Sequence, residues 1–344
     1  MKKPYKLQST AEPYLWILPS VILMAIFIVI PIGFVFRMAF SQVTKAGLIK
    51  GFYGFKNFQK VLESAKFAMV LKNTIVWTIL VVVLSTVLGF ILALLLAVAR
   101  LSKLNVFRCL STEAQRDLAG RGGFLYALAR FNPVSFLANV YVEVFRATPM
   151  LVQLFIIYYV VFNGVDLPKF KIFGFIRFDR FLPGVVALAL NSGAYLSEII
   201  RSGIQSIDGG QTEAARSLGM TQLQNMRFIV LPQAIKNILP AIANEFVTII
   251  KESSICYTIG VQEIMYAVSS VKGATYSIAE PLLVATAVYF CLTFPTSKII
   301  AHFEKKMSVG DKRSGAERQR KRKLGFAGKG AQPVPMVTTE EETK

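Results

Sequence analysis

The stretch VLKNTIVWTILVVVLSTVLGFILALLLAVA, residues 70–99, decides the class of protein to which this chain belongs. It is almost continuously apolar, and Lys72 carries its only charge. A helix crosses a bilayer with about 20 such residues. This run is longer, so it can span a membrane with some tilt.

The composition of the whole chain agrees with a membrane protein. Its 344 residues are 54% hydrophobic and 17% charged, and the mean hydropathy is +0.51. A soluble domain of this length rarely has so little charge. We therefore expect an all-α polytopic membrane protein with about six spans, at residues 14–38, 70–99, 138–162, 182–201, 236–260 and 281–303. The last-but-one span is interrupted by Glu245, Lys251 and Glu252.

Basic residues predict which loops face the cytoplasm. Lys and Arg gather at the N-terminus, in residues 100–136 and after residue 304. Cytoplasmic loops carry an excess of Lys and Arg, and six spans place these regions on one side together with 201–235. The lysine-rich loop 39–68 fits this topology poorly, because it falls outside. The first apolar run is too long for a signal peptide, so we interpret it as a retained anchor.

Metal and disulfide chemistry find little support in the sequence. The three cysteines, Cys109, Cys256 and Cys291, are far apart and form no CxxC pair, and His302 is the only histidine. We expect neither a zinc site nor a disulfide framework. We also expect no catalytic residues and no metal ligands in this chain.

Residues 212–232, TEAARSLGMTQLQNMRFIVLP, are unusually polar for this chain. Thr221 and Gln224 have the spacing of a capping box, which predicts the start of a helix. Gly219 stands where a left-handed glycine would end the preceding helix. Pro232 disfavours helix at Leu231. We predict two short helices joined by a tight turn, with Ala214, Ala215 and Leu218 forming a small-residue face on the first.

The spacing within this stretch is specific. Glu213-Ala214-Ala215 is followed by three residues and Gly219, then by nine residues and Ile229-Val230-Leu231-Pro232. This pattern resembles the EAA-x3-G-x9-I-x-L-P motif of ATP-binding-cassette importer permeases. The resemblance implies a type I importer permease fold, in which this cytoplasmic loop docks on a separate ATPase subunit. It implies that Glu213, Ala214, Ala215 and Gly219 form the docking helix and its end, and that Leu231 and Pro232 begin the return to the membrane.

The chain contains no G-x-x-x-x-G-K-[ST] phosphate loop. We therefore expect that it is not an enzyme, that it binds no cofactor, and that ATP and Mg²⁺ are bound by the partner ATPase. The implied partners are ATPase subunits, a second permease subunit that is identical or different, an extracytoplasmic solute-binding protein and the lipid bilayer. We expect no nucleic acid partner.

Two parts of the chain resemble two different families of importer permeases. Residues 137–307 resemble permeases for polar amino acids, through stretches such as LALNSGAYLSEIIRSGIQSI and LPAIANEFVTIIKESSICYTIGV. Residues 13–108 resemble the opening of a sugar-importer permease, with YLWILPSVILMAIFIVIPIGFVFRMAF as the first span. The resemblance places the protein in a bacterial cytoplasmic membrane and favours import of polar amino acids. Sugar import, an ATP-independent carrier and a non-functional fusion stay open as alternatives.

We divide the chain accordingly. Residues 1–12 form a cytoplasmic N-terminus, 13–108 a membrane hairpin and 109–136 a cytoplasmic linker. Residues 137–307 form the core with its coupling loop, 202–235, and 308–344 a disordered basic tail. The tail sequence RQRKRK fits a solvated tail, and also anionic lipid or nucleic acid as binding partners.

Polar residues inside spans are costly and often face a cavity. Gln153, Asn191 and Glu245 are our candidates for the substrate pathway. A carboxylate in such a cavity would suit an amino or guanidinium group. The competing interpretation is hydrogen bonding between helices.

Overall fold

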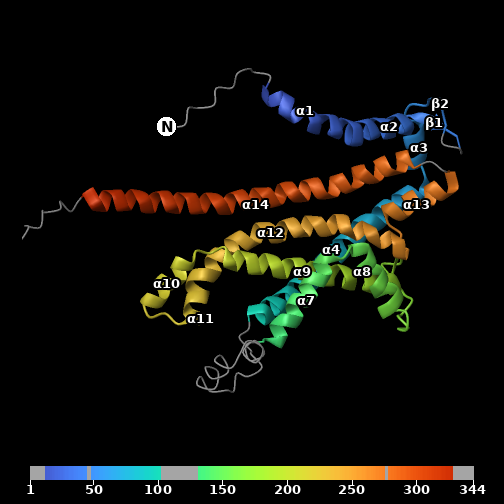
Figure 1. Cartoon of the computed structure of the whole chain (residues 1–344). Coiled ribbons are helices and arrows are strands. Elements are labelled where there is room, and N and C mark those ends of the chain that lie inside the picture. Colours follow the sequence, from blue (N-terminus) through green and yellow to red (C-terminus); the bar gives the residue numbers. More distant parts are fainter. Residues whose placement is uncertain (1–11, 45–47, 102–130, 276–277, 328–344) are drawn as a thin grey trace, which may run out of the picture. The chain divides into compact units, whose positions relative to one another are not determined.

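A computed structural model describes residues 12–44, 48–101, 131–275 and 278–327 of the chain. Two compact units divide the chain, residues 1–296 and 297–344. The predicted N-terminal segment lies almost wholly outside the described residues, as do Cys109 and most of the predicted linker. The described part is predominantly helical (Figure 1), as the composition predicts.

The N-terminal helix is continuous but changes its winding before a proline. It consists of α1 (Glu12–Met24), a π-helical turn (Ala25–Val29) and α2 (Ile30–Ala39). Pro31 opens α2, and the wider turn before it accommodates the missing backbone donor. Strands β1 (Ser41–Val43) and β2 (Ile49–Phe52) form an antiparallel pair, and α3 (Lys56–Leu62) follows.

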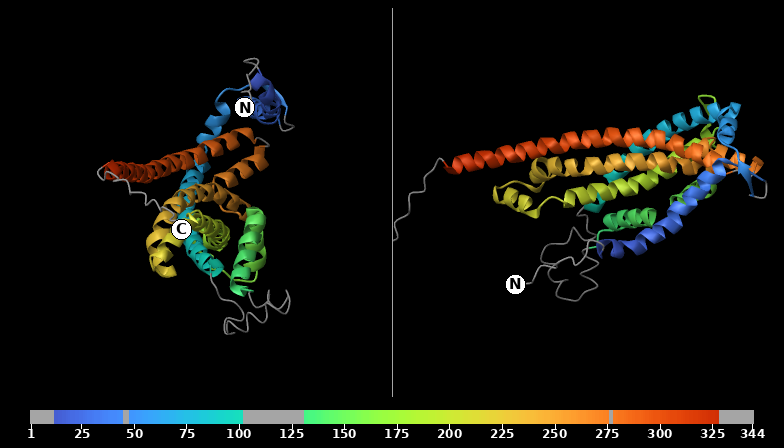
Figure 2. Two further views of the ribbon diagram at one scale, coloured as in Figure 1. Left: turned by 60° about the vertical axis from the view of Figure 1, so that its left-hand side comes forward. Right: turned by 90° about the horizontal axis from the view of Figure 1, so that it is seen from above.

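Two long helices dominate the remainder of the first unit. These are α4 (Ala65–Leu101) and α9 (Phe178–Gln205), which pack along each other (Figures 1 and 2). Between them in sequence lie α7 (Pro133–Ala147), α8 (Met150–Ile156), a π-turn (Ile157–Val161), β3 (Lys171–Ile172) and β4 (Ile176–Arg177). After α9 come α10 (Gly209–Ser217), α11 (Gln222–Asn225), a π-turn (Met226–Val230), α12 (Leu231–Glu252), a 3₁₀ helix (Ser253–Ile259), α13 (Ile264–Thr275) and α14 (Ala279–Ala327).

The crossing of α4 and α9 depends on glycine. A Cβ atom at Gly89 would lie 3.1 Å from the carbonyl oxygen of Ala189, and one at Gly193 would lie 2.8 Å from Leu92 Cδ2. Small residues allow helix backbones to approach closely in membranes, where burial between helices gives no hydrophobic gain. A glycine likewise allows α9 and α12 to approach closely, because a Cβ at Gly203 would overlap Ile238.

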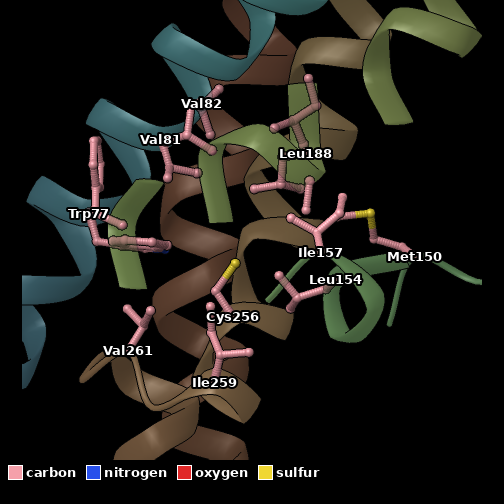
Figure 3. Close-up of a cluster of buried hydrophobic side chains, with 14 of the residues drawn as sticks. Trp77, Val81, Val82, Met150, Leu154, Ile157, Leu188, Cys256, Ile259 and Val261 are labelled. Atoms are coloured by element: carbon pink, nitrogen blue, oxygen red, sulfur yellow. The ribbon is translucent and has the colours of Figure 1, made fainter. Parts of the chain in front are cut away.

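The main apolar core lies where α4, α8, α9 and the end of α12 meet. Trp77 of α4 packs edge-on against Phe181 of α9, with ring centroids 5.7 Å apart. Figure 3 shows side chains of four segments converging there: Trp77, Val81, Val82, Met150, Leu154, Ile157, Leu188, Cys256, Ile259 and Val261. Thus α4, which we assigned to the N-terminal hairpin, packs in the core together with α9.

The predicted third span is bent. Helices α7 and α8 meet at 113°, because Thr148 and Pro149 are both extended. Proline removes a donor and excludes helix at the residue before it, which explains the break. The span predicted at 138–162 therefore corresponds to a bent pair of helices, which can count as one broken span.

Four of the described helices are long and apolar enough to cross a membrane: Tyr14–Ala39, Lys66–Arg100, Phe178–Gln205 and Ala279–Phe303. The bent pair raises this number to five if it counts as one span. Helix α12 is not among them, and Glu245, Lys251 and Glu252 reduce its hydropathy. The span predicted at residues 236–260 therefore stays a prediction.

The tail differs from its prediction over residues 308–327. These residues belong to α14, which ends at Ala327. The segment contains three Lys and four Arg residues, which are good helix formers, and no proline interrupts it. Residues 328–344 lie outside the described residues, and the binding alternatives for the tail stay predictions.

A buried carboxylate joins the start of α13 to α14. Glu263 is completely buried, and its carboxylate accepts hydrogen bonds from Tyr266 N at 3.1 Å and from Tyr289 Oη at 2.8 Å. Within the residues that the structure describes, Glu263 forms no ion pair. Burial raises the pKa of Glu263 from the ordinary 4.5 to about 7.

This geometry predicts how stability depends on pH. Because the folded protein keeps a proton on Glu263 that the unfolded chain releases, stability falls as pH rises from 4.5 to about 7. Glu263→Gln should remove this fall and stabilise the protein at pH 8, by about 3 kcal/mol at most. Thermal unfolding of both proteins at pH 5 and pH 8 checks this. Equal pH dependence in the two would exclude Glu263 as its source.

Candidate functional site

The loop between α9 and α12 contains the short helix α10. Asp208 caps this helix, and its side chain accepts a hydrogen bond from Gly210 N at 2.9 Å. Ala215 is buried and α10 packs on the π-turn Met226–Val230, whereas Glu213 and Ala214 are exposed. Leu218 is 83% exposed. The predicted face of Ala214, Ala215 and Leu218 is therefore not one surface, because only Ala215 points inward.

Gly219 ends this helix as the sequence predicts. Its φ is +79°, and Gly219 N and Met220 N donate to the carbonyl oxygens of Arg216 and Ala215 at 3.0 and 3.1 Å. No atom lies within 4 Å of the position that a Cβ would occupy. Glycine is thus required here by backbone conformation and not by space.

The capping box at Thr221 is also confirmed. Thr221 N donates to Gln224 Oε1 at 2.8 Å, and Gln224 N donates to Thr221 Oγ1 at 3.3 Å. The reciprocal pair fixes where α11 begins. The turn between α10 and α11 is therefore defined at both ends by local chemistry.

The predicted interruption at Pro232 is absent. Leu231 is helical, with φ −61° and ψ −43°, and the chain stays helical from α11 into α12. The π-turn Met226–Val230 comes immediately before Leu231, and such a turn accommodates the donor that Pro232 lacks. Figure 2 shows α10 and α11 beyond the ends of α9 and α12.

Gln153 and Asn191 are brought together, but in a packed setting. Asn191 Nδ2 donates to Gln153 Oε1 at 2.9 Å, and both residues are buried. Gln153 Nε2 donates to the carbonyl oxygens of Phe145 and Thr148 at 2.7 and 3.0 Å. The pair therefore stabilises the bend between α7 and α8 and connects it to α9. A role in the substrate pathway stays a prediction for both residues.

Glu245 is the third candidate, and among the described residues no hydrogen bond joins it to Gln153 or Asn191. It lies half-buried on α12, and among the described residues no hydrogen bond or ion pair engages its carboxylate. A carboxylate without a partner can bind an ammonium or guanidinium group. Of the three candidates, Glu245 is the one whose side chain is free to do so.

A charged cluster that the sequence does not reveal lies near the cytoplasmic end predicted for α9. Glu198 pairs with Arg100 of α4 at 2.9 Å, with Arg201, and with Arg146 of α7 at 4.0 Å. Arg100 also donates to Asn139 at 2.7 Å. These contacts connect α4, α7 and α9, so Glu198 serves helix packing. The pair of Glu198 with Arg201 is local in sequence, but the pairs with Arg100 and Arg146 are long-range, and no local sequence pattern could have found those two.

Metal binding finds no geometric basis in the described ranges, which contain no group of three or more His, Cys, Asp or Glu side chains placed to hold an ion. Cys256 is buried in the core and Cys291 is exposed.

Comparison with known protein families shows to which family this chain is similar. Residues 120–309 match the family of binding-protein-dependent transport system inner membrane components. The chain belongs to this family. The match contains the whole loop between α9 and α12 and all three pathway candidates, and it begins after α4. The chain is therefore a membrane-embedded permease subunit, and ATP hydrolysis is the work of a separate subunit.

Individual relatives transport amino acids. The permease is 37% identical over 234 residues to the arginine transport system permease protein ArtQ of Bacillus subtilis, covering 68% of this chain and 90% of that protein. It is 35% identical over 244 residues to a putative glutamine transport system permease protein GlnP of Rickettsia typhi, covering 71% and 95%. Among solved structures, an amino acid ABC transporter with histidines matches with a TM-score of 0.56 and 35% identity, covering 72% of the permease and 98% of that chain.

Proposed function

We propose that this chain is the membrane-spanning subunit of an ATP-driven importer of polar amino acids in a bacterial cytoplasmic membrane. An external binding protein delivers the amino acid, and a second permease subunit completes the pathway. One ATPase subunit, which holds ATP and Mg²⁺, docks on the loop between α9 and α12 of this chain, and a second ATPase docks on the second permease subunit.

The observation that carries this proposal is the geometry of α10. The helix rests on the π-turn through Ala215 and presents Glu213 and Ala214 outward. Gly219 and the Thr221 capping box fix its exit. A rigid helix held at both ends transmits a push from a docked partner to α9 and α12, to which it is joined in sequence.

Arginine and glutamine permeases among the relatives support a polar amino acid as substrate. Glu245 supplies an unpaired carboxylate that would bind the amino group or a cationic side chain. Sugar import gains no support from these relatives, although the N-terminal third resembles sugar permeases. The family membership also argues against an ATP-independent carrier.

Glu213→Lys tests the docking helix. Reversing this exposed charge should reduce the amount of ATPase that co-purifies with the permease by about tenfold, equivalent to about 1.4 kcal/mol of binding free energy. Glu63→Lys is the matched control, because Glu63 is exposed immediately after α3 in the loop predicted to lie on the opposite side. Unchanged ATPase recovery with Glu213→Lys would remove α10 from the interface.

A further inference from the structure

A hollow of about 470 Å³ lies between the end of α2 and the strand pair β1–β2. Its walls are mainly apolar and are formed chiefly by Phe36, Phe40, Ile49 and Phe52. Ligand sites in proteins typically measure about 300–1,000 Å³. The hollow is therefore large enough to hold a ligand group, and it lies outside residues 120–309, which carry the family match.

Hydrogen bonds hold the strand pair against the end of α2. Ser41 Oγ donates to Arg37 O at 2.6 Å, and Tyr53 N donates to Phe40 O at 2.7 Å. The side chain of Asn57 adds a third bond, from its Nδ2 to Ser41 O at 2.9 Å. The fold itself thus fixes the walls of the hollow, and a ligand that binds there has little of the protein to order.

The charge of the lining selects an anion. Among the described residues that line the hollow, Arg37 is the one with a charge, and its side chain is exposed. No hydrogen bond or ion pair with another described residue engages its guanidinium group. A guanidinium group binds phosphate or carboxylate oxygens through two parallel hydrogen bonds.

The segment around the hollow has an excess of positive charge. Residues 37–66 contain six basic residues and one acidic residue, Glu63. Lys56 and Lys60 both lie over the ring of Tyr53, with Nζ 5.3 and 5.2 Å from its centroid, and neither forms an ion pair with a described carboxylate. These lysines fitted the predicted topology poorly. A bound anion would reduce the repulsion among them.

The position of the hollow identifies this anion as a lipid headgroup. Arg37 lies in the last turn of the apolar helix Tyr14–Ala39, which is long enough to cross a membrane. The hollow is therefore at the bilayer surface, whichever way this helix crosses. Phe36 is 49% exposed and belongs both to the hollow and to the apolar surface of α2, and Phe52 is 84% exposed. A phospholipid would cover these rings, whereas a soluble anion would leave them in water.

We propose that this hollow binds an anionic phospholipid, whose phosphate pairs with Arg37 and whose glycerol and upper acyl carbons contact Phe36 and Phe52. A lipid with a net negative charge is favoured over a zwitterionic one, because the nearby lysines have no carboxylate partners. The bound lipid holds the end of the N-terminal helix at the membrane surface. This site is independent of the transported substrate and of the ATPase.

Arg37→Gln tests the role of the charge, because glutamine retains a hydrogen-bond donor but is neutral. Phosphatidylglycerol is titrated into the full permease in detergent, and bound lipids are counted by native mass spectrometry. The variant should bind about tenfold more weakly than the unmodified protein. Phosphatidylcholine should bind the unmodified protein more weakly than phosphatidylglycerol does. The control Arg227→Gln removes an exposed arginine over the ring of Phe228, outside the hollow, and should bind normally.

Gly51→Trp tests the hollow while Arg37 is retained. Gly51 lines the hollow, its φ is not positive, and no atom lies within 4 Å of its Cβ position. The indole ring can therefore occupy the hollow without backbone strain, and phosphatidylglycerol binding should again weaken by about tenfold. Gly33→Trp is the matched control, since Gly33 is exposed on α2, lies outside the hollow and has equally open space.

Unchanged phosphatidylglycerol binding by Arg37→Gln or by Gly51→Trp would overturn the proposal. Equal affinity of the unmodified protein for phosphatidylglycerol and phosphatidylcholine would overturn it too. Normal lipid binding by Arg37→Gln, together with weaker binding of the external binding protein, would assign the hollow to a protein interface instead. Complete displacement of the lipid by inorganic phosphate would mean a simple anion site and would also contradict the proposal.

Discussion

Gly219→Val should reduce ATP-driven uptake by about tenfold or more while the permease still inserts in the membrane. Gly219 has φ +79°, and a side chain in this left-handed region costs about 1–2 kcal/mol, more for a β-branched one. The strain is relieved if the turn after α10 rearranges. Such a rearrangement would move the docking helix relative to the π-turn on which it rests. Uptake in vesicles containing equal amounts of the two permeases measures the loss.

Gly209→Val provides the control for this experiment. Gly209 begins the same helix, has no positive φ, and no atom lies within 4 Å of its Cβ position. The added side chain is identical, but the backbone strain is absent. Near-normal uptake is therefore expected. If Gly219→Val also transports normally, the turn has no part in coupling.

Gly89→Val should destabilise the folded permease more than any surface change. The first added atom would lie 3.1 Å from Ala189 O and 3.2 Å from Gly193 N, both backbone atoms that side-chain rotation cannot move. The helices α4 and α9 must then separate, which loosens the core around Trp77. Overpacking of this kind typically costs about 1–3 kcal/mol. We expect the midpoint of thermal unfolding in detergent to fall by roughly 5 °C.

Gly33→Val separates this steric effect from the general cost of valine in a membrane helix. Gly33 lies on α2, is exposed, and has no atom within 4 Å of its Cβ position. The unfolding temperature of the Gly33→Val variant should remain that of the unmodified protein. Equal shifts for Gly33→Val and Gly89→Val would contradict the close crossing of α4 and α9.

The sequence predicts best what local chemistry determines. The end of α10 at Gly219 and the start of α11 at Thr221 both follow from interactions between residues close together in the chain. They could therefore be located before the structure was known. The apolar runs likewise predict the long helices, since length and hydropathy are local properties.

Prolines show where the same reasoning fails. Pro232 predicts an interruption that the structure lacks, whereas Pro149, within a segment predicted as one span, precedes the bend between α7 and α8. The difference is the π-turn before Pro232, which accommodates the missing donor within a continuous helix. Apolar periodicity does not distinguish these two outcomes.

The candidate site was foreseen in part. The motif identifies α10, but it gives no indication that Ala215 is the buried residue of its small-residue face, because this burial arises from packing of α10 on the π-turn. Gln153 and Asn191 stood out only as polar residues in apolar segments. Their mutual hydrogen bond spans 38 residues of sequence, which no local pattern could reveal.

Uptake by proteoliposomes measures directly whether this permease imports polar amino acids at the expense of ATP. The permease is reconstituted with its ATPase and binding protein, ATP is enclosed with the ATPase, and labelled polar amino acids and sugars are supplied in parallel. We predict uptake of a polar amino acid that requires ATP and is lost with Gly219→Val. Sugar uptake without amino acid uptake, or amino acid uptake that proceeds equally well without ATP, would contradict the account.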